Sequence, residues 1–439
     1  MPQKSKLFFI LFIIMFNSVL MAQLTTSSPY SILGIGDPES LGFTEQNSMG
    51  DVKYGLATPI FINPANPASF TMLKKPVFIT DITTHSITFI NDTFKQSEQN
   101  TYIRNFSFGF PVIRKKNRWG MAFGLMPWTK MGYSIQNMDS VMNFGEVIYQ
   151  YNGSGEINRF NFGNGLNIIN NLNDTSGIKL SLGLNVSYLF GSIYKIQRVL
   201  PKDASYAFNT LVSNSMHISD VNLEAGLLYF QRFSSKLLVS AGGCFAFSDS
   251  LKSHHTLLSR SYTGQTNFET FKDTVQYDTN DISIFNPLSY GLGMGIYIGK
   301  RWVIGFDYYK KDWSQFSISD QNMGLASSQQ FSTGLQIQPD QQAVTKFFKT
   351  LMYRGGFRYA TTRLLVQDKH LTEYGISFGL GIPLIKAQSH GSSINIGFET
   401  GKRGEDKEGI ILERFVNLNF GFTFTPHKFD QWFYKRKID

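Results

Sequence analysis

The chain is poor in the residues that mark several common classes of protein. Its 439 residues include a single cysteine, Cys244, which excludes an internal disulfide. Only 17% of the residues are charged, against about 25% in a typical soluble domain. The sequence contains no P-loop, no G-x-S-x-G elbow, no H-E-x-x-H and no cysteine pair for a metal. These absences predict a protein that is not an enzyme and holds no metal or cofactor.

Long apolar runs are also scarce. One run, Leu7 to Phe16, follows two lysines and is too short for a membrane-spanning helix. We interpret residues 1–22 as a secretory signal peptide that is cut between Ala22 and Gln23. No later stretch is apolar enough for a spanning helix. The exported chain is therefore either soluble or a β-barrel.

Aromatic residues and glycine are abundant, with 40 Phe, 20 Tyr and 39 Gly. From about residue 76 the pattern has a period of two. Between residues 178 and 190, for example, Leu180, Leu182 and Leu184 share one parity with other apolar residues, while Ser181 and Asn185 belong to the other. Such alternation is typical of a strand with one apolar face.

The alternating segments predict about fourteen strands separated by turn residues. They lie near residues 76–90, 101–114, 117–137, 141–152, 155–170, 177–193, 204–214, 217–232, 236–250, 254–276, 283–299, 301–317, 350–362 with 371–384, and 391–402 with 409–424. The segment 318–349 is polar and is predicted as a long connection with one short helix, residues 341–349.

Two all-β folds fit this pattern. The apolar faces point inward in a soluble sandwich and toward lipid in a transmembrane antiparallel β-barrel. The predicted strands have about ten to sixteen residues, against about five or six in globular sheets. Aromatic residues also gather at strand ends, as in an interfacial girdle: Trp119, Trp128, Tyr188, Phe190, Trp302, Tyr308, Tyr309 and Trp313. We therefore favour an outer-membrane barrel over residues 76–424, followed by a basic periplasmic tail, residues 425–439.

The stretch from Ser27 to Leu73 has no period and contains the run Asn63, Pro64, Ala65, Asn66, Pro67, Ala68. Its prolines lack backbone donors and disfavour helix in the residues before them. Apolar residues spread through the stretch argue against disorder. The sequence predicts that residues 23–75 pack inside an enclosure that satisfies their backbone. Acids here, such as Asp37 and Glu39, are predicted as solvated turn charges.

A signal peptide, an Asn-Pro-Ala motif and a barrel of about fourteen strands together resemble the FadL-type outer-membrane transport family. Asn63-Pro64-Ala65 matches the motif, and Asn66-Pro67-Ala68 repeats it. The resemblance implies a hatch, residues 23–75, in the barrel lumen and passive uptake of hydrophobic molecules such as long-chain fatty acids or hydrocarbons. It also implies an inward strand kink that opens a lateral gap. Pro127 is the candidate for this kink, and a strand end or bulge is the alternative.

Two functions remain open at this point. One is passive uptake, and the other is a non-transporting scaffold or adaptor barrel of a secretion or assembly complex. A continuous apolar tunnel that reaches the hatch would favour uptake, and a filled polar lumen with a large exposed apolar patch would favour a scaffold. Both place the chain in the bacterial outer membrane, where its basic residues can contact lipopolysaccharide phosphates. No nucleic-acid partner is predicted.

Overall fold

The structure is a computed structural model that describes residues 28–91, 94–113, 118–142, 145–172, 177–202, 208–264, 268–341, 343, 346–366, 369–384, 391–405 and 410–426. The predicted signal peptide, the Ala22–Gln23 bond and residues 427–439 of the predicted tail lie outside these ranges. No helix formed by the described residues is long and apolar enough to cross a membrane.

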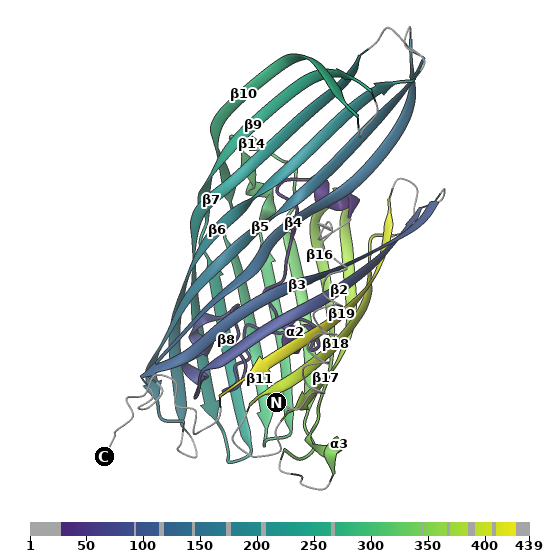
Figure 1. The fold of residues 1–439 in the computed structure, drawn as a ribbon. Coiled ribbons are helices and arrows are strands. Elements are labelled where there is room, and N and C mark those ends of the chain that lie inside the picture. Colours follow the sequence, from purple (N-terminus) through teal and green to yellow (C-terminus); the bar gives the residue numbers. More distant parts are fainter. Residues whose placement is uncertain are drawn as a thin grey trace, which may run out of the picture.

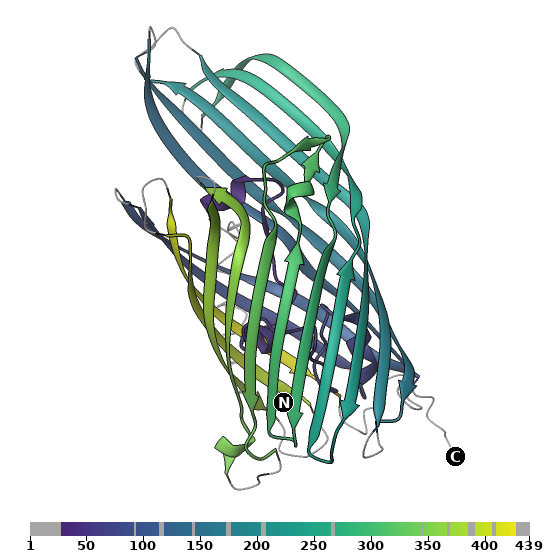
Figure 2. The same ribbon diagram turned by 180° about the vertical axis from the view of Figure 1, so that it is seen from behind.

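Antiparallel strands form one closed barrel (Figures 1 and 2). Closure comes from β2 (Val77–Asn91), which pairs with β19 (Leu412–Phe424) from Phe78↔Phe424 to Ile90↔Leu412. In the described part of the chain the wall consists of fourteen strands, four of which are interrupted into two segments each. The predicted fold class, a transmembrane-type barrel, is confirmed.

The wall strands follow one another around the barrel in chain order. The other uninterrupted strands are β3 (Phe94–Ile113), β4 (Trp119–Val141), β5 (Gly145–Asn170), β6 (Ile178–Pro201), β7 (Asn209–Arg232), β16 (Met352–Val366), β17 (Lys369–Pro383) and β18 (Ser393–Arg403). The interrupted strands are β8 (Leu237–Ala246) with β9 (Asp249–Thr263), β10 (Thr270–Asn286) with β11 (Ser289–Ile298), β12 (Trp302–Lys311) with β13 (Ser317–Ile318), and β14 (Gln321–Asn322) with β15 (Ser328–Ile337).

The two faces of the wall differ as the alternation predicts. On β6, Leu182 and Leu184 are exposed on the outside, whereas Ser181 and Asn185 are buried toward the lumen. The same outward exposure of large apolar residues recurs on other strands, for example Phe160, Val221, Leu292, Phe378 and Phe420. An apolar outer band with a polar interior is the pattern of a barrel in lipid and the reverse of a soluble sandwich.

The wall is much taller on one side. β5 has 26 residues and β6 has 24, whereas β18 has 11 and β19 has 13. The long strands β4 to β7, with β9 and β10, rise beyond the rest of the barrel (Figures 1 and 2). We call this part the projecting wall.

Several predicted boundaries were wrong even though the strand count was right. Segments 141–152 and 155–170 form the single strand β5, and 204–214 and 217–232 form the single strand β7. Gly155, where the second of the two predicted segments begins, lies inside β5 with a φ of 122° and remains in register with both neighbouring strands.

Other segments were divided differently from the prediction. Segment 254–276 spans the hairpin from β9 to β10, and 283–299 is shared by β10 and β11. The polar segment 318–349 contains the wall strand β15, and its short helix, α3, covers only Phe347–Thr350. The strand β15 is polar because its inner face binds the N-terminal segment: Gln330 Nε2 donates to Asp51 at 3.0 Å.

Candidate functional site

The N-terminal segment, residues 28–75, lies inside the barrel (Figure 1). It contains η1 (Pro29–Ile32), β1 (Asp37–Pro38), α2 (Thr44–Asn47) and η2 (Pro67–Met72). Phe43, Ile62 and Phe70 are buried and pack with Val77 and Ile79 of β2. The barrel thus encloses an aperiodic stretch that could not bury these side chains by itself.

The Asn-Pro-Ala run is tied together by its two asparagines. Asn63 Nδ2 donates to the carbonyl of Leu56 at 2.9 Å, and Asn63 Oδ1 accepts from the N–H of Ala65 at 3.2 Å. Asn66 repeats the second contact, because its Oδ1 accepts from Ala68 N–H at 3.1 Å and caps η2. A short polar side chain that bonds its own backbone two residues onward is typical of such turns.

The run also bonds to the wall. Asn66 Nδ2 donates to the carbonyl of Leu227 on β7 at 3.1 Å, and Asn185 Nδ2 on β6 donates to the carbonyl of Pro64 at 3.0 Å. A wall side chain thus satisfies the Pro64 carbonyl, and a side chain of the run donates to the wall backbone. The run is a docking element that forms no strand in the wall.

Two glycines of the inner face allow this close approach. A Cβ at Gly183 of β6 would overlap the backbone between Pro67 and Ala68, and a Cβ at Gly242 of β8 would overlap the carbonyl of Tyr54. Only a residue without a side chain lets two backbones meet in this way. The small residues that alternate with apolar ones in the sequence are thus contact points for the N-terminal segment.

The wall ladder is incomplete between β3 and β4. These strands pair from Phe106↔Leu125 to Ile113↔Trp119, and beyond that point β3 pairs with β2 and β4 pairs with β5. Figure 1 shows the two strands separating upward. We call this opening the β3–β4 seam.

Pro127 lies directly at the start of this seam. It pairs with Asn158 of β5, and the register of β4 against β5 shifts between Pro127 and Thr129. The predicted kink residue therefore sits at a bulge in mid-strand, two residues beyond Leu125, where the pairing with β3 ends. Proline suits this site because it has no N–H to donate to a neighbouring strand.

The N-terminal segment occupies the seam. Its short strand β1 pairs with β4 through Asp37↔Lys130 and Pro38↔Thr129, and Glu39 N–H donates to the carbonyl of Trp128 at 2.9 Å. A free edge of β4 thereby gains a backbone partner.

Glu39 also connects the two sides of the seam. Its carboxylate lies 3.5 Å from Arg104 Nη2 on β3 and 3.8 Å from Lys130 Nζ on β4. Arg104 donates to the carbonyl of Ser40 at 3.1 Å, and Lys130 Nζ lies 3.3 Å from the ring centre of Tyr102. Backbone pairing and opposite charges together bridge the two strands at the start of the seam.

Asp37 anchors the other end of β1 to the far wall. Its carboxylate accepts from Arg403 Nη1 at 2.9 Å and Nη2 at 3.2 Å, and from Arg363 Nη2 at 3.4 Å. Burial by itself raises the pKa of the Asp37 carboxyl, but the two guanidinium groups outweigh it and hold the pKa below its usual value. A two-pronged arginine contact is among the strongest that a carboxylate makes.

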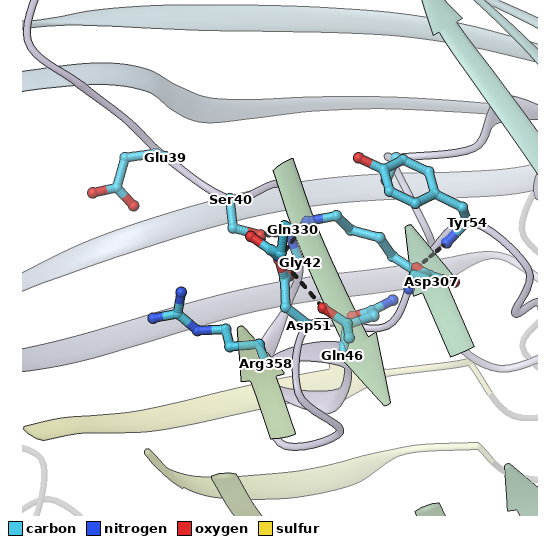
Figure 3. Close-up of polar contacts among 12 residues, drawn as sticks. Glu39, Ser40, Gly42, Gln46, Asp51, Tyr54, Asp307, Gln330 and Arg358 are labelled. Atoms are coloured by element: carbon cyan, nitrogen blue, oxygen red, sulfur yellow. Dashed lines mark hydrogen bonds and ion pairs between the residues drawn. The ribbon is translucent and has the colours of Figure 1, made fainter. Parts of the chain in front are cut away.

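Asp51 forms a second buried ion pair, within the N-terminal segment (Figure 3). It lies 2.7 Å from Lys53 Nζ and accepts from Ser40 Oγ at 2.6 Å. Burial by itself raises the pKa of Asp51, but the charge of Lys53 and three hydrogen bonds outweigh this effect. The pKa of Asp51 therefore lies below its usual value. Asp307 of β12 adds a tether, because its Oδ2 accepts from the N–H groups of Lys53 and Tyr54 at 2.6 and 2.8 Å.

Glu45 of α2 differs from these two aspartates. Its Oε1 accepts from Asn395 Nδ2 at 2.8 Å and Thr423 Oγ1 at 2.9 Å, while its Oε2 has no partner among the described residues. Burial raises the pKa of Glu45, and the opposing attraction of Arg354 does not offset this effect. Glu45 is thus the acid of the N-terminal segment that burial pushes toward its neutral form.

A polar cavity of about 390 Å³ lies between the N-terminal segment and the wall. Acidic and basic side chains line it in equal number: Glu39, Asp51, Glu224, Glu373, Glu399, Lys53, Arg104, Arg159, Lys311 and Arg358. Most of them pair with one another; Arg159, for instance, lies 2.8 Å from Glu224. The lining is rich in charge and contrasts with the apolar walls usual for hydrophobic ligands.

An apolar cluster lies in the lumen near the middle of the long strands β6 and β7. Ile193, Ile218 and Leu251 of β6, β7 and β9 pack there with Ile35 of the N-terminal segment and Phe316 from the loop between β12 and β13. These side chains are fully buried. The cluster therefore fills part of the lumen with well-packed side chains.

The structure corrects several residue-level predictions. Asp37 and Glu39 are not solvated turn charges, because their carboxylates are paired and only 19% and 21% exposed. Trp128, Tyr309 and Trp313 were predicted in an interfacial girdle, but all three line the cavity. In the described chain no three His, Cys, Asp or Glu side chains converge as metal ligands.

Solved structures place the fold in a recognisable class. At a TM-score of 0.59 and 11% identity, 89% of this chain matches all of a FadL homologue from Pseudomonas aeruginosa. The toluene transporter TbuX of Ralstonia pickettii is similar with a TM-score of 0.56 and 12% identity, covering 88% of this chain and 99% of TbuX. TodX, a toluene transporter of Pseudomonas putida, gives 0.54 and 12%, covering 89% and 100%. The FadL-type resemblance is therefore confirmed for the fold.

A comparison with protein families identifies the chain more specifically than the similarity in fold does. A family model described as BamG matches residues 4–439, so this chain belongs to the BamG family. No curated protein matches the sequence.

Proposed function

We propose that this chain is an outer-membrane barrel with a closed lumen, which serves as a structural subunit of an assembly complex. The charged cavity is the observation that carries this proposal. An apolar molecule gains about 25 cal/mol per Å² when it leaves water for apolar surroundings, and walls that carry formal charges do not offer that gain. The family name, BamG, supports a Bam-related partner.

Location in the outer membrane follows from export and from the outer surface. The predicted signal peptide delivers the chain beyond the inner membrane, and the exposed apolar band suits lipid. In outer-membrane barrels short turns face the periplasm. The three-residue turn from β11 to β12 then marks the periplasmic end, and the projecting wall extends outside the cell.

Passive uptake of hydrophobic molecules is the second candidate. The β3–β4 seam favours it, because an interrupted ladder is a lateral path once the N-terminal segment moves. The similar solved structures include toluene transporters, which supports the same role. In this mechanism Glu39 would leave Arg104 and Lys130, β1 would leave β4, and an apolar molecule would pass between the strands.

A paired experiment separates the two functions. The chain is tagged at its chromosomal position and isolated in mild detergent, and a deletion strain is assayed both for its outer-membrane barrels and for uptake of oleate and toluene. The assembly role predicts a stoichiometric outer-membrane partner and reduced levels of other barrels in the deletion strain, with unchanged uptake. Normal barrel levels with reduced uptake would overturn the assembly role in favour of transport.

A further inference from the structure

The projecting wall ends in a sheet edge without a described partner. β10 pairs with β9 from Thr270 to Asn286. On its other side β13 pairs only with Ile284 and Phe285, and Ser319 N–H donates to the carbonyl of Ser283. Across the described chain, no strand pairs with the outer edge of β10 before these residues. Figure 2 shows β10 rising past the shorter strands β12 to β17.

This edge is open to solvent along its whole length. Every residue from Thr270 to Asp281 is exposed. Val275 is 68% exposed and Tyr277 is 62% exposed, so apolar surface lies beside the unpaired backbone. Long open edges with apolar side chains are rare in soluble surfaces because they pair with other chains.

One part of the edge is suited to pairing. The register of β10 against β9 shifts between Phe271 and Asp273 and between Thr274 and Gln276. From Gln276 onward the register is continuous. Bulges twist an edge away from a partner, whereas an even ladder accepts one. The stretch from Gln276 to Ile282 is therefore the part that can take up an added strand.

The charge of this stretch selects the occupant. Asp278 and Asp281 are exposed, and the Asp281 side chain is 90% exposed although it lies 2.9 Å from His254 Nδ1 on β9. The stretch contains no basic residue. A second copy would pair poorly: antiparallel pairing centred between Thr279 and Asn280 would set Asp278 opposite Asp281 of the other copy. Like charges directly opposite are destabilising, and opposite charges stabilise.

We propose that the β10 edge from Gln276 to Ile282 binds an extended, basic strand of a partner protein by β-augmentation. Main-chain hydrogen bonds would supply affinity, and lysine or arginine side chains opposite Asp278 and Asp281 would supply specificity. The proposal rests on the proposed role in an assembly complex for its biological setting, while the site itself is tested independently of that role.

The test uses the full chain in lipid nanodiscs and hydrogen–deuterium exchange. One probe is an acetylated seven-residue peptide of Val with Lys at positions 2 and 5, which antiparallel pairing sets opposite Asp281 and Asp278. Its control carries Glu in place of Lys. The basic peptide is expected to slow amide exchange in residues 276–282 at least about tenfold, and the acidic peptide to leave it unchanged. The double variant D278K/D281K should lose this protection, and D139K on the free edge of β4 should keep it.

Three results would overturn the proposal. Equal protection by both peptides would show pairing without charge selection. Slower amide exchange along β4 instead of β10 in the presence of the basic peptide would place the binding site on β4. Slow exchange of residues 276–282 without peptide, with a dimer by light scattering, would make a second copy the occupant. Each result leaves the partner isolation described above unaffected, so failure of the edge and failure of the assembly role are distinguishable.

Discussion

Glu39 lies 3.5 Å from Arg104, and this contact links the N-terminal segment to the β3 side of the seam. The partner strand β4 is held by the backbone of the same residue, which donates to Trp128. A single residue thus contacts both strands where their own ladder is missing. The closed state of the barrel depends on this segment as well as on the wall.

Replacing Glu39 by Gln is expected to loosen the seam. The variant keeps the backbone bond but loses the attraction to Arg104 and Lys130, a contribution of about 1 kcal/mol for a partly exposed pair. Amide exchange of β1 should become about fivefold faster, since each 1.4 kcal/mol corresponds to a factor of ten. E98Q, in the outer part of β3, is the matched control. Unchanged exchange in E39Q would show that backbone pairing alone holds β1.

Gly183→Ala tests the close approach of the Asn-Pro-Ala run. The added Cβ overlaps the backbone of Pro67 and Ala68, so we expect a destabilisation of about 1–3 kcal/mol, as for overpacked cores. Gly355→Ala is the control, because a Cβ there meets only the carbonyl of Ser377 at 3.9 Å. Thermal unfolding in detergent measures both. Equal Tm values for the two variants would contradict the contact.

Asp37→Asn should be the most damaging single change in the N-terminal segment. It leaves Arg363 and Arg403 without their shared carboxylate, and breaking a buried pair costs about 3–5 kcal/mol. Limited proteolysis should then cut residues 28–75 while the barrel persists. Asp320→Asn, at an exposed turn with a φ of 62° that asparagine tolerates, should change nothing. Resistance of D37N to protease would refute the anchoring role.

The acids of the N-terminal segment predict an asymmetric pH dependence. Asp37 and Asp51 have lowered pKa values, so their stabilisation is present above their unfolded pKa of about 3.9 and is lost as the pH falls through the folded values. Glu45 has a raised pKa, so its contribution is present below its unfolded pKa of about 4.3 and is lost as the pH rises through the folded value.

Stability should therefore be highest under mildly acidic conditions. Glu45→Gln keeps an oxygen for Asn395 and Thr423 but removes the charge. We expect E45Q to have a higher Tm than the natural chain at neutral pH and a smaller change between neutral and mildly acidic buffer. Differential scanning fluorimetry over that range decides the matter. Parallel Tm profiles for the two proteins would assign the pH dependence to other groups.

The barrel could be predicted from the sequence because the alternation of apolar and polar residues depends only on neighbouring positions. Neighbouring strand residues point to opposite faces, so Leu182 beside Ser181 predicts one outward and one inward side chain without information from the rest of the chain. The enclosure of residues 28–73 followed from the same logic, since a stretch with apolar residues and no period needs an external partner. The positions at which strands begin and end were harder to predict. Gly155 is as compatible with a strand interior as with a turn, and only its neighbours on β4 and β6 decide between them.

The charged lumen could not be predicted from the sequence. Asp37 and Arg403 are 366 positions apart in the chain, and nothing in the local pattern of either residue indicates the other. The polar stretch that contains β15 looked like a connection for the same reason, because its partner Asp51 lies 279 positions from Gln330. Pairing across the lumen depends on barrel closure, which fixes every distance at once.

The central claim, a lumen closed to apolar molecules by charge and by the N-terminal segment, is tested most directly by flux through the purified barrel. The natural chain is reconstituted in liposomes loaded with radiolabelled toluene or oleate. Release of the label is compared with release from loaded liposomes without protein and from loaded liposomes that carry a variant lacking residues 28–75. If the lumen is closed, the natural chain should release the label no faster than protein-free liposomes do, and the deletion variant should release it faster. Saturable release by the natural chain would contradict it.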